Sequence, residues 1–545
     1  MKQFLFIVLT ICLPSIQVLA QCPENSEDKV LLVGDSWAFF MGVDGTINNV
    51  FEDWGFPEYK FYTNLTLAEN GAETVDFFKP SKQNEISSKL LSKPSIKFVH
   101  LSIGGNDVLG SWKSQSFTEQ QVDEMILATE DSLNQVIDFI KSVRPDITIV
   151  WSGYAYPNFE EVIKSFLIPS QHPFYSTWDK MEKPSFQEIN ELLNRFSDDV
   201  EAMYANDPRV FYVKAPGITQ YTYGQTSALG VPPSGTYPAY TAPLPYGYVN
   251  YPSPKNSMRN YGITKDCFHL SQQGFKDLVG YTTQKFYHKA LMDDTYIIAS
   301  DNQTNGSVSS DGTVSSQLLL GEEGGINYKT LLTFETMNQL TYNVEKASIF
   351  LHRIQQTGGN PVEESIEIEV KNGAFGASFA VEPVDYTATG TQSGTPCLHG
   401  SNTDGNWVRL DLPIELLPFI TNNENTQFKI ISGITASAKV EFSNVDDPDF
   451  APVLNITYGT TPTLSIAEDF ISPELIIYPN PTSTTLHVAL KYADFIQANL
   501  YSLDGKQVMK SIESNMNVMG ISPGTYILRV NTSKGVLYQK VVIEN

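Results

Sequence analysis

Short apolar runs that alternate with amphipathic helical stretches restrict the fold of this chain more than any other feature. Between residues 28 and 292, strand-like runs such as Val30–Val33 and Ile147–Trp151 are separated by segments whose apolar residues recur at helical spacing. This alternation is typical of a parallel sheet with helices on both faces. The sequence therefore predicts an α/β domain over residues 21–292.

Several elements of this domain can be placed from their ends. A strand is expected at Tyr59–Tyr62. One helix is expected to start after Thr118, which forms a capping box with Gln121, and another after Ser185, which does the same with Glu188. The apolar positions of both helices are expected to be core.

The second half of the chain reads as β-structure. Past Asp293 the helical pattern disappears, and short alternating segments separated by Gly, Asn and Asp predict a jelly-roll-like β-sandwich over residues 293–460. A linker at 461–472 then precedes a small all-β sandwich at 473–545. Several domains are expected in any case, because 545 residues exceed what one hydrophobic core supports.

Charge and the first residues bear on partners and location. The formal net charge of −25 argues against nucleic acid as a partner, since phosphate binding needs a basic patch. Lys2, the apolar run Phe4–Ile11 and the small-residue site ending at Ala20 predict a secretory signal peptide over residues 1–20. A transmembrane anchor is not expected there, because the run is too short and Pro14 interrupts it, and no other stretch is apolar enough.

The cysteines add two points. Cys22 raises the alternative of a lipoprotein, but Gln21 stands where a small residue is needed, so cleavage after Ala20 is favoured. Cys22, Cys267 and Cys397 then remain, enough for one disulfide and one free thiol, and their pairing stays open. No CxxC pair is present, so a cysteine-ligated zinc site is not expected.

A serine follows the first predicted strand. Val30–Val33 ends at Gly34, where the chain can turn without a Cβ clash, and Ser36 comes where its hydroxyl would stand clear of the sheet. One interpretation is a nucleophile. The other is an ordinary strand-ending turn, because Gly-Asp-Ser is common turn chemistry.

Three further stretches bear on Ser36. Gly71 follows the second strand, Asn106 follows the third, and Asp266 and His269 precede a predicted helix. Each is expected on a loop beside a strand end or a helix start, so all could meet at one edge of a parallel sheet.

These residue types suit nucleophilic catalysis. A serine attacks when a histidine takes its proton, and the histidine needs a carboxylate to fix its tautomer. Asp266 and His269 lie three residues apart, so a single turn can present both. The N–H groups of Ser36 and Gly71 and the amide of Asn106 suit an oxyanion hole.

Each of these signals also has a structural interpretation. A lone Asp-x-x-His is weak, Asn106 could cap its loop, and Asp107 is expected to do so. Trp37 and Cys267 are expected to pack. Residues 215–262 are dominated by Pro, Gly and Tyr, and we interpret them as an ordered flap that shapes a cleft. The alternative is a coat on the outside of the sheet.

Taken in order, the blocks Gly34-Asp35-Ser36, Gly71, Gly104-x-Asn106-Asp107 and Asp266-x-x-His269 resemble those of the SGNH (GDSL) hydrolase family. The resemblance covers about half of the chain. It implies a flavodoxin-like α/β/α three-layer fold and ester hydrolysis through an acyl-enzyme, with no cofactor and no metal. It also implies that Ser36 is the nucleophile, His269 the base and Asp266 its orienting acid, with Gly71 and Asn106 at the oxyanion hole.

The later regions carry two more resemblances. Ile477–Pro481, Gly524–Val530 and Lys540–Val542 are similar to the C-terminal sorting domain of type IX secretion substrates, which implies that secretion machinery as a partner. Stretches such as Ala347–Leu351 and Pro452–Leu454 resemble the DNRLRE-type β-sandwich, which implies carbohydrate binding.

The sequence as a whole predicts a secreted or cell-surface serine esterase that removes O-acyl groups, acetate first, from a polysaccharide. The longer flap departs from a minimal family member, so the substrate cannot be transferred from the resemblance. A lipase or short-chain carboxylesterase and an acyltransferase are alternatives with the same triad. A glycan-binding surface protein with an inactive SGNH domain is the alternative from another class.

Overall fold

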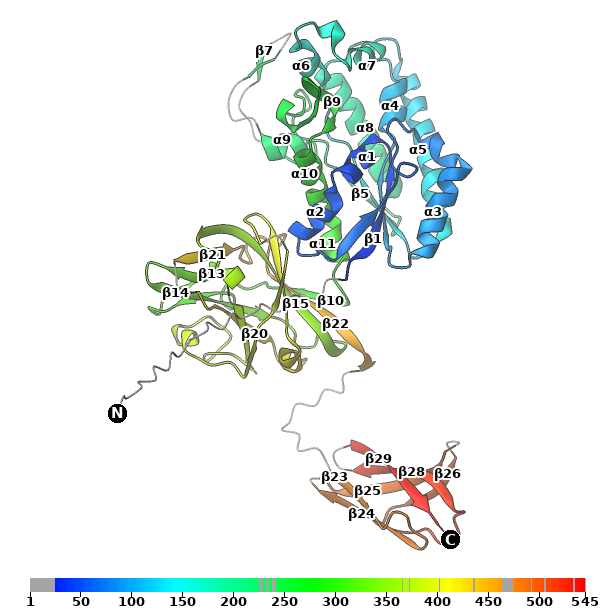
Figure 1. The fold of residues 1–545 in the computed structure, drawn as a ribbon, viewed down its shortest axis with the longest axis vertical. Coiled ribbons are helices and arrows are strands. Elements are labelled where there is room, and N and C mark those ends of the chain that lie inside the picture. The colour runs from blue at the N-terminus through cyan, green and yellow to red at the C-terminus, as the bar shows by residue number, and fades with distance from the viewer. Residues whose placement is uncertain are drawn as a thin grey trace, which may run out of the picture. The chain divides into compact units, whose positions relative to one another are not determined.

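The computed structural model divides the chain into two compact units, Met1–Leu464 and Ser465–Asn545 (Figure 1). The predicted signal peptide, most of the predicted linker and much of the tyrosine-rich tip at 225–241 lie outside the described residues. The structure describes residues 25–224, 229–231, 235–237, 242–364, 366–371, 373–400, 402–434, 437–462, 474–491, 493–503, 506–532 and 535–544.

The first unit begins with a five-stranded sheet in the order β2-β1-β3-β4-β5. All four strand pairs are parallel. This is the doubly wound order of flavodoxin-like folds, and it confirms the predicted parallel α/β domain. The strands are β1 Glu27–Gly34, β2 Tyr59–Tyr62, β3 Phe98–Ser102, β4 Thr148–Ser152 and β5 Val210–Val213.

Helices cover both faces of this sheet (Figure 1). The capping boxes predicted at Thr118 and Ser185 are both present, at the starts of α5 and α8. One layer contains α3 Pro80–Ser92, α4 Gly105–Ser111, α5 Glu119–Val143 and α8 Phe186–Tyr204; the other contains α1 Ser36–Val43, α2 Thr46–Asp53, α9 Ile218–Tyr223, α10 Gln272–Thr282 and α11 His288–Ala290.

Smaller elements complete the α/β domain. An antiparallel hairpin precedes α10 and carries two of the predicted site residues. These elements are α6 Phe159–Lys164, α7 Tyr175–Lys180, β6 Leu229–Val231, β7 Gly235–Tyr237, β8 Met258–Tyr261, β9 Thr264–Leu270, the short 3₁₀ helices Thr74–Phe78, Pro169–Gln171 and Lys255–Ser257, and a π-helical turn at Thr283–Tyr287.

The middle of the chain is an antiparallel β-structure, as predicted, in which thirteen strands form one hydrogen-bonded network. Its resemblance to the jelly-roll and DNRLRE types stays a prediction. The strands are β10 Thr295–Ile298, β11 Gly306–Ser309, β12 Val314–Ser315, β13 Leu318–Glu323, β14 Ile326–Phe334, β15 Tyr342–Gly358, β16 Ile366–Lys371, β17 Gln392–Gly394, β18 Cys397–His399, β19 Trp407–Asp411, β20 Thr426–Ser432, β21 Ala438–Phe442 and β22 Val453–Pro462, with α12 at Pro361–Glu364 and 3₁₀ turns at Pro383–Tyr386 and Ile414–Phe419.

The α/β domain and the β-structure share one core. Phe350, Trp407 and Val453 of the β-structure are buried in the same hydrophobic cluster as the parallel sheet. Trp407 stacks on Trp54 of the α/β domain with ring centroids 5.7 Å apart. An interface with buried aromatic contacts of this kind favours one rigid unit over two freely moving domains.

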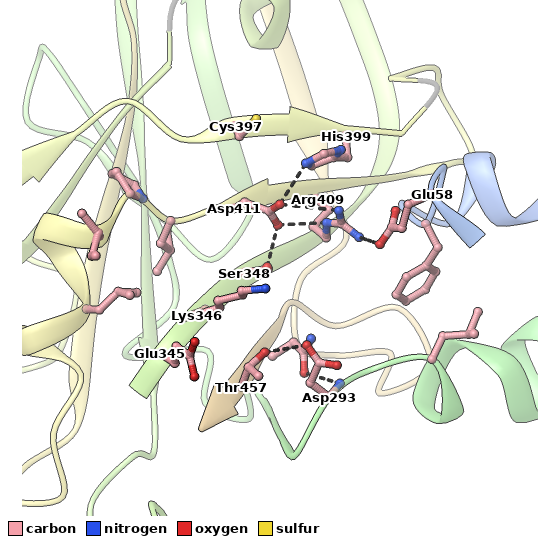
Figure 2. A pocket seen from close by; sticks show the side chains of 18 of the residues that line it. Glu58, Asp293, Glu345, Lys346, Ser348, Cys397, His399, Arg409, Asp411 and Thr457 are labelled. Atoms are coloured by element: carbon pink, nitrogen blue, oxygen red, sulfur yellow. Dashed lines mark hydrogen bonds and ion pairs between the residues drawn. The ribbon is translucent and has the colours of Figure 1, made fainter. Parts of the chain in front are cut away.

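A cavity of about 630 Å³ lies beside this shared core, at the amino-terminal ends of β1 and β2 (Figure 2). Arg409 crosses it and donates to Oε1 of Glu58 at 2.7 Å. Asp411 is drawn between Ser348, His399 and Arg409 in the same view. We call Ser348, His399, Arg409 and Asp411 the junction cluster.

The second unit is a small all-β module, as predicted. Its strands form a three-stranded sheet and a four-stranded sheet. They are β23 Glu474–Tyr478, β24 Thr485–Lys491, β25 Phe495–Ser502, β26 Gln507–Ser511, β27 Asn515–Asn517, β28 Gly524–Thr532 and β29 Gly535–Ile543. Among the residues that the structure describes in either unit, none of the helices has the length and apolarity that a bilayer crossing requires.

Candidate active site

The turn from β1 into α1 presents Ser36 as the first helical residue. Gly34 allows this turn, because a Cβ atom there would lie 1.9 Å from the carbonyl oxygen of Ser102 on β3. Asp35 caps the helix by accepting the N–H of Trp37 at 2.9 Å. The Ser36 N–H has no intrahelical partner at this position, so it is available to an anion.

Ser36, His269 and Asp266 form a hydrogen-bonded chain. Nε2 of His269 lies 2.8 Å from Oγ of Ser36, and its Nδ1 lies 2.8 Å from Oδ2 of Asp266. Ser36 is 3% and Asp266 1% exposed, so both side chains lie where little water reaches. The three residues come from opposite ends of the domain, and the structure brings them into the arrangement that the spacing predicted.

The local structure around His269 differs from the predicted loop, because Asp266 and His269 lie within β9. The pairing with β8 is irregular there: Met258 opposes Leu270, whereas Asn260 opposes Lys265. Residues 266–269 therefore bulge out opposite the single residue 259, and such bulges re-aim side chains. The bulge is fixed by Oδ1 of Asp266, which accepts the N–H groups of Phe268 and His269, each at 2.8 Å.

The Gly71 loop meets the start of α4 beside these three residues, and Asn106 is the second residue of that helix rather than part of the predicted loop. Gly71 has a φ of +77°, which favours glycine. The segment just before it runs along the end of β1, since Gly34 donates to Leu67 and accepts from Glu69. The amide of Asn106 donates to the carbonyl of Ala72 at 2.9 Å, which ties both predicted oxyanion residues together.

Asp107 and Trp37 have the structural roles expected of them. Both carboxylate oxygens of Asp107 accept the N–H of Thr74 at 3.1 Å, and one also accepts its hydroxyl at 2.6 Å. Trp37 is fully buried and packs edge-on against Tyr154 at 4.9 Å.

A buried tyrosine beneath the site has no counterpart in the sequence predictions. Tyr154 donates to Oδ2 of Asp35 at 2.6 Å and accepts the N–H of Gly105 at 3.0 Å. Burial raises the pKa of Asp35 to about 7, although the hydrogen bonds from Tyr154 and from the Trp37 N–H oppose the rise. Tyr154 follows the carboxyl end of β4, so the sheet-edge rule that selected Ser36 and Asn106 could have found it.

Aromatic side chains surround His269, and these were also not predicted. Phe40 lies 4.9 Å from the imidazole centroid and Phe174 6.5 Å from it. Tyr261 contacts Phe174 at 5.3 Å and is 51% exposed. The Arg259 guanidinium stacks 4.1 Å over Phe40, and a double ion pair with Asp44 at 2.7 and 2.8 Å holds it there.

A pocket of about 540 Å³ lies on the Gly71 side of the site. Two of its lining residues are close in sequence to predicted site residues: Phe39 follows Ser36 by one helical turn, and Asn70 precedes Gly71. Its lining residues are Phe39, Leu65, Thr66, Ala68, Glu69, Asn70, Lys79, Ser81 and Lys82.

The described part of the tyrosine-rich segment packs on α8. Asn190 of α8 donates to the carbonyls of Val249 and Tyr251 at 2.9 and 2.7 Å, and Tyr246 donates to Asp198 at 2.5 Å. This is the packing of the coat alternative. The role of the segment as a flap stays a prediction, because much of its tip lies outside the described residues.

Cys267 is a free thiol buried between the two proposed triad members. Burial raises its pKa, so it is held as an unreactive thiol. Cys397 is disulfide-bonded. Within the described residues, no group of three or more His, Cys, Asp or Glu side chains is arranged to hold a metal ion.

Family models match both ends of the chain. Residues 28–278 match the GDSL-like lipase/acylhydrolase family, and residues 476–544 match the secretion system C-terminal sorting domain. A sorting domain of this kind directs its protein to secretion or to the outer cell surface. No curated protein sequence matches the chain.

Solved structures that match part of the chain include two carbohydrate esterases and a lipase. A family 3 carbohydrate esterase from Clostridium thermocellum is 16% identical, with a TM-score of 0.26 and coverage of 49% of this chain and 99% of its own. A carbohydrate acetylesterase from Sinorhizobium meliloti is 12% identical, with a TM-score of 0.24 and coverage of 49% and 100%. An extracellular lipase from Streptomyces rimosus is 15% identical, with a TM-score of 0.24 and coverage of 48% and 99%.

Proposed function

We propose, from the premise that residues 28–278 are an ester-hydrolase domain of the GDSL-like lipase/acylhydrolase family, that this domain is a serine esterase acting through Ser36, His269 and Asp266. The observation that carries the proposal is the pair of 2.8 Å contacts that place His269 between the other two residues. A serine polarised in this way can attack a carbonyl carbon.

In the first half of the reaction, Oγ of Ser36 bonds to the ester carbonyl carbon while Nε2 of His269 takes its proton. Asp266 stabilises the imidazolium through Nδ1. The oxyanion is held by the N–H groups of Ser36 and Gly71 and by the amide of Asn106. The intermediate collapses as the alcohol leaves with the proton from His269, and an acyl-enzyme remains.

In the second half, a water molecule takes the place of the alcohol. His269 removes its proton as the water oxygen attacks the acyl carbon, and the carboxylic acid leaves when Ser36 recovers the proton. The same steps with a sugar hydroxyl in place of water would make the domain an acyltransferase. Water and acceptor therefore have to be compared directly.

We propose that the substrate is an O-acyl ester on a polysaccharide and that the acyl group is acetyl. Six of the nine residues that line the 540 Å³ pocket next to α1 are polar or charged, and their hydrogen-bonding groups would suit a hydroxyl-rich alcohol. The exposed ring of Tyr261 next to Phe174 offers an aromatic surface on the other side of His269. The sorting domain would deliver such an enzyme to the place where extracellular polymers are found.

The test compares the mature protein with Ser36→Ala on aryl esters of increasing chain length and on acetylated polysaccharides. We expect turnover that is fastest for acetate and absent in Ser36→Ala. A maximum at long chains would favour the lipase alternative, and acyl transfer to an added oligosaccharide would favour the acyltransferase. Equal rates for both proteins on every substrate would contradict the esterase.

We also propose that the β-structure holds the enzyme on its polymer. A pull-down with insoluble polysaccharides should use the full chain with Ser36→Ala, because residues 293–460 alone would expose Phe350 and Trp407. Retention is expected. The absence of retention on every polymer that the active enzyme deacetylates would remove the tethering role.

A further inference from the structure

The buried hydroxyl of Tyr154 connects the turn that carries Ser36 with the start of α4, which carries Asn106. Tyr154 is 5% exposed, and its ring is held between Trp37 at 4.9 Å and Phe268 at 5.9 Å. Its hydroxyl contacts Asp35, which precedes the nucleophile, and Gly105, which precedes Asn106. The two hydrogen-bond partners of Tyr154 therefore lie one position before Ser36 and one position before Asn106.

The direction of these hydrogen bonds is fixed by the groups present. The Gly105 N–H can only donate, so the Tyr154 oxygen accepts from it and its own proton goes to Oδ2 of Asp35. Oδ1 of Asp35 takes the Trp37 N–H. A proton on Oδ2 would leave the tyrosine proton without an acceptor in this set, and a buried unpaired donor is costly.

Gly105, the first residue of α4, shows how closely Tyr154 approaches this helix. A Cβ atom at this position would lie 2.8 Å from Cζ of Tyr154, 3.0 Å from its Cε1 and 3.1 Å from its hydroxyl oxygen. The start of α4 therefore packs directly on the tyrosine. Asp35 in turn caps α1 and sets the position of Ser36.

We propose that Tyr154 is a positioning residue of the proposed esterase. Its hydroxyl holds the turn that carries Ser36 and the start of α4, which carries Asn106, at a fixed separation. The inference rests on the proposed function. With the hydroxyl in place, the Ser36 N–H and the Asn106 amide are organised toward one oxyanion before the substrate arrives. Without it, the two donors would have to find that separation during the reaction.

A pH dependence follows from the same contacts. Burial raises the pKa of Asp35 to about 7; Tyr154, the Trp37 N–H and the charge of His269 lower it, and Asp107 raises it. Removal of the tyrosine hydroxyl takes away one of the lowering contacts. Asp35 would then stay protonated to a higher pH, and the acid limb of kcat/KM would move to higher pH.

The test compares Tyr154→Phe with Tyr204→Phe on an aryl acetate across the pH range. Tyr204 is a matched control, because it is 6% exposed and its hydroxyl donates to Asn134 of α5 at 2.5 Å, not to Asp35 or Gly105. For Tyr154→Phe we expect kcat to fall about 10-fold to 100-fold with little change in KM, and the acid limb to move upward. Tyr204→Phe is expected to keep the wild-type rate and pH profile.

A wild-type kcat and pH profile in folded Tyr154→Phe would overturn the inference, as would equal losses in both variants. Should Tyr154→Phe fail to fold, Asp35→Asn decides instead, because asparagine can still cap α1 while the charge is removed. A lowered kcat together with an acid limb that differs from that of the wild type supports the inference, and a wild-type kcat overturns it. Failure of the proposed function itself would be seen separately, as a wild-type protein no faster than Ser36→Ala.

Discussion

In the described residues, serine, histidine and aspartate meet near both ends of β1. At the carboxyl end, His269 lies between Ser36 and Asp266, 2.8 Å from each. At the amino end, in the junction cluster, Asp411 lies between the other two: Ser348 donates to it at 2.6 Å and Nε2 of His399 lies 2.8 Å from it (Figure 2). Eight strand residues separate the two ends by about 25 Å.

The order of the contacts decides what each group can do. A serine beside an imidazole has a base that can accept its proton at neutral pH. Ser348 instead points its proton at a carboxylate. Burial alone would raise the pKa of Asp411, but the hydrogen bond from His399 and the charge of Arg409 hold it below its usual value, so it is a poor base.

The junction cluster is therefore suited to hold the two domains together. Nε of Arg409 lies 2.9 Å from Asp411, and the same guanidinium reaches Glu58 across the interface. In the described residues no hydrogen bond links Ser348 to His399. The comparison teaches that composition alone does not identify a catalytic triad, and variants matched between the two groups can test it.

The largest contrast is expected between the two serines. Ser36→Ala should lower kcat by about 10⁴-fold or more, because the nucleophile is lost and only binding and oxyanion contacts remain. Ser348→Ala should keep the wild-type rate. Initial rates on an aryl acetate measure both, and a comparable loss in Ser348→Ala would place chemistry at the junction.

The next largest contrast in kcat is expected between variants of the two aspartates. Asp266→Asn should lower kcat by about 10³–10⁴-fold, because the amide cannot stabilise the imidazolium and favours the wrong tautomer of His269. Asp411→Asn should leave kcat unchanged and lower the midpoint of urea unfolding, because Arg409 loses a charged partner. The reverse distribution of effects would show that the two groups have been assigned to the wrong ends of the sheet.

The sequence could predict the part of the site that depends only on where strands end in the sequence. Ser36 and Asn106 follow the carboxyl ends of neighbouring parallel strands, so the sheet-edge rule places them together without any knowledge of side chains. The 2.8 Å geometry around His269 also needs the bulge in β9, which depends on pairing with β8. No local pattern in Asp266–His269 announces that pairing.

Tyr154 and the junction cluster were missed for a related reason. Both depend on contacts between residues far apart in the chain, such as Tyr154 with Asp35 and Arg409 with Glu58. Apolar periodicity identifies which side of an element is buried, but it does not say which buried polar group will meet which. The parallel α/β domain and the β-rich character of the later regions, which rest on periodicity, were predicted correctly, whereas the jelly-roll form of the β-structure stays a prediction.

A smaller catalytic effect is expected at the oxyanion hole. Asn106→Ala should lower kcat by about 10²–10³-fold, because one preorganised donor is lost while the triad stays intact. Asn455→Ala is a suitable control at the junction, where Asn455 accepts the N–H of Asp293 at 3.0 Å. Pre-steady-state acylation rates report the step directly, and an effect confined to KM would argue against the oxyanion role of Asn106.

The smallest effects are expected for the charged contacts between the domains. Arg409→Met removes the charged partner of Glu58 and one of the partners of Asp411. It should lower the free energy of unfolding by about 1–3 kcal/mol, less than a fully buried pair would lose, because both acids are partly exposed. Lys285→Met breaks the exposed pair with Asp449 in the same interface and should cost about 0.5 kcal/mol or less. Neither should change kcat.

The stability difference between the wild type and Arg409→Met should also depend on pH. The folded-state pKa of Asp411 is lowered, so its contribution to stability is present above the unfolded pKa of about 3.9 and is lost as the pH falls through the folded value. The gap between the wild type and Arg409→Met should therefore be larger at pH 7 than below pH 4. Urea unfolding at both pH values measures it. A gap that stays constant would mean that Arg409 stabilises the junction through packing of its side chain on Phe350, not through its charge.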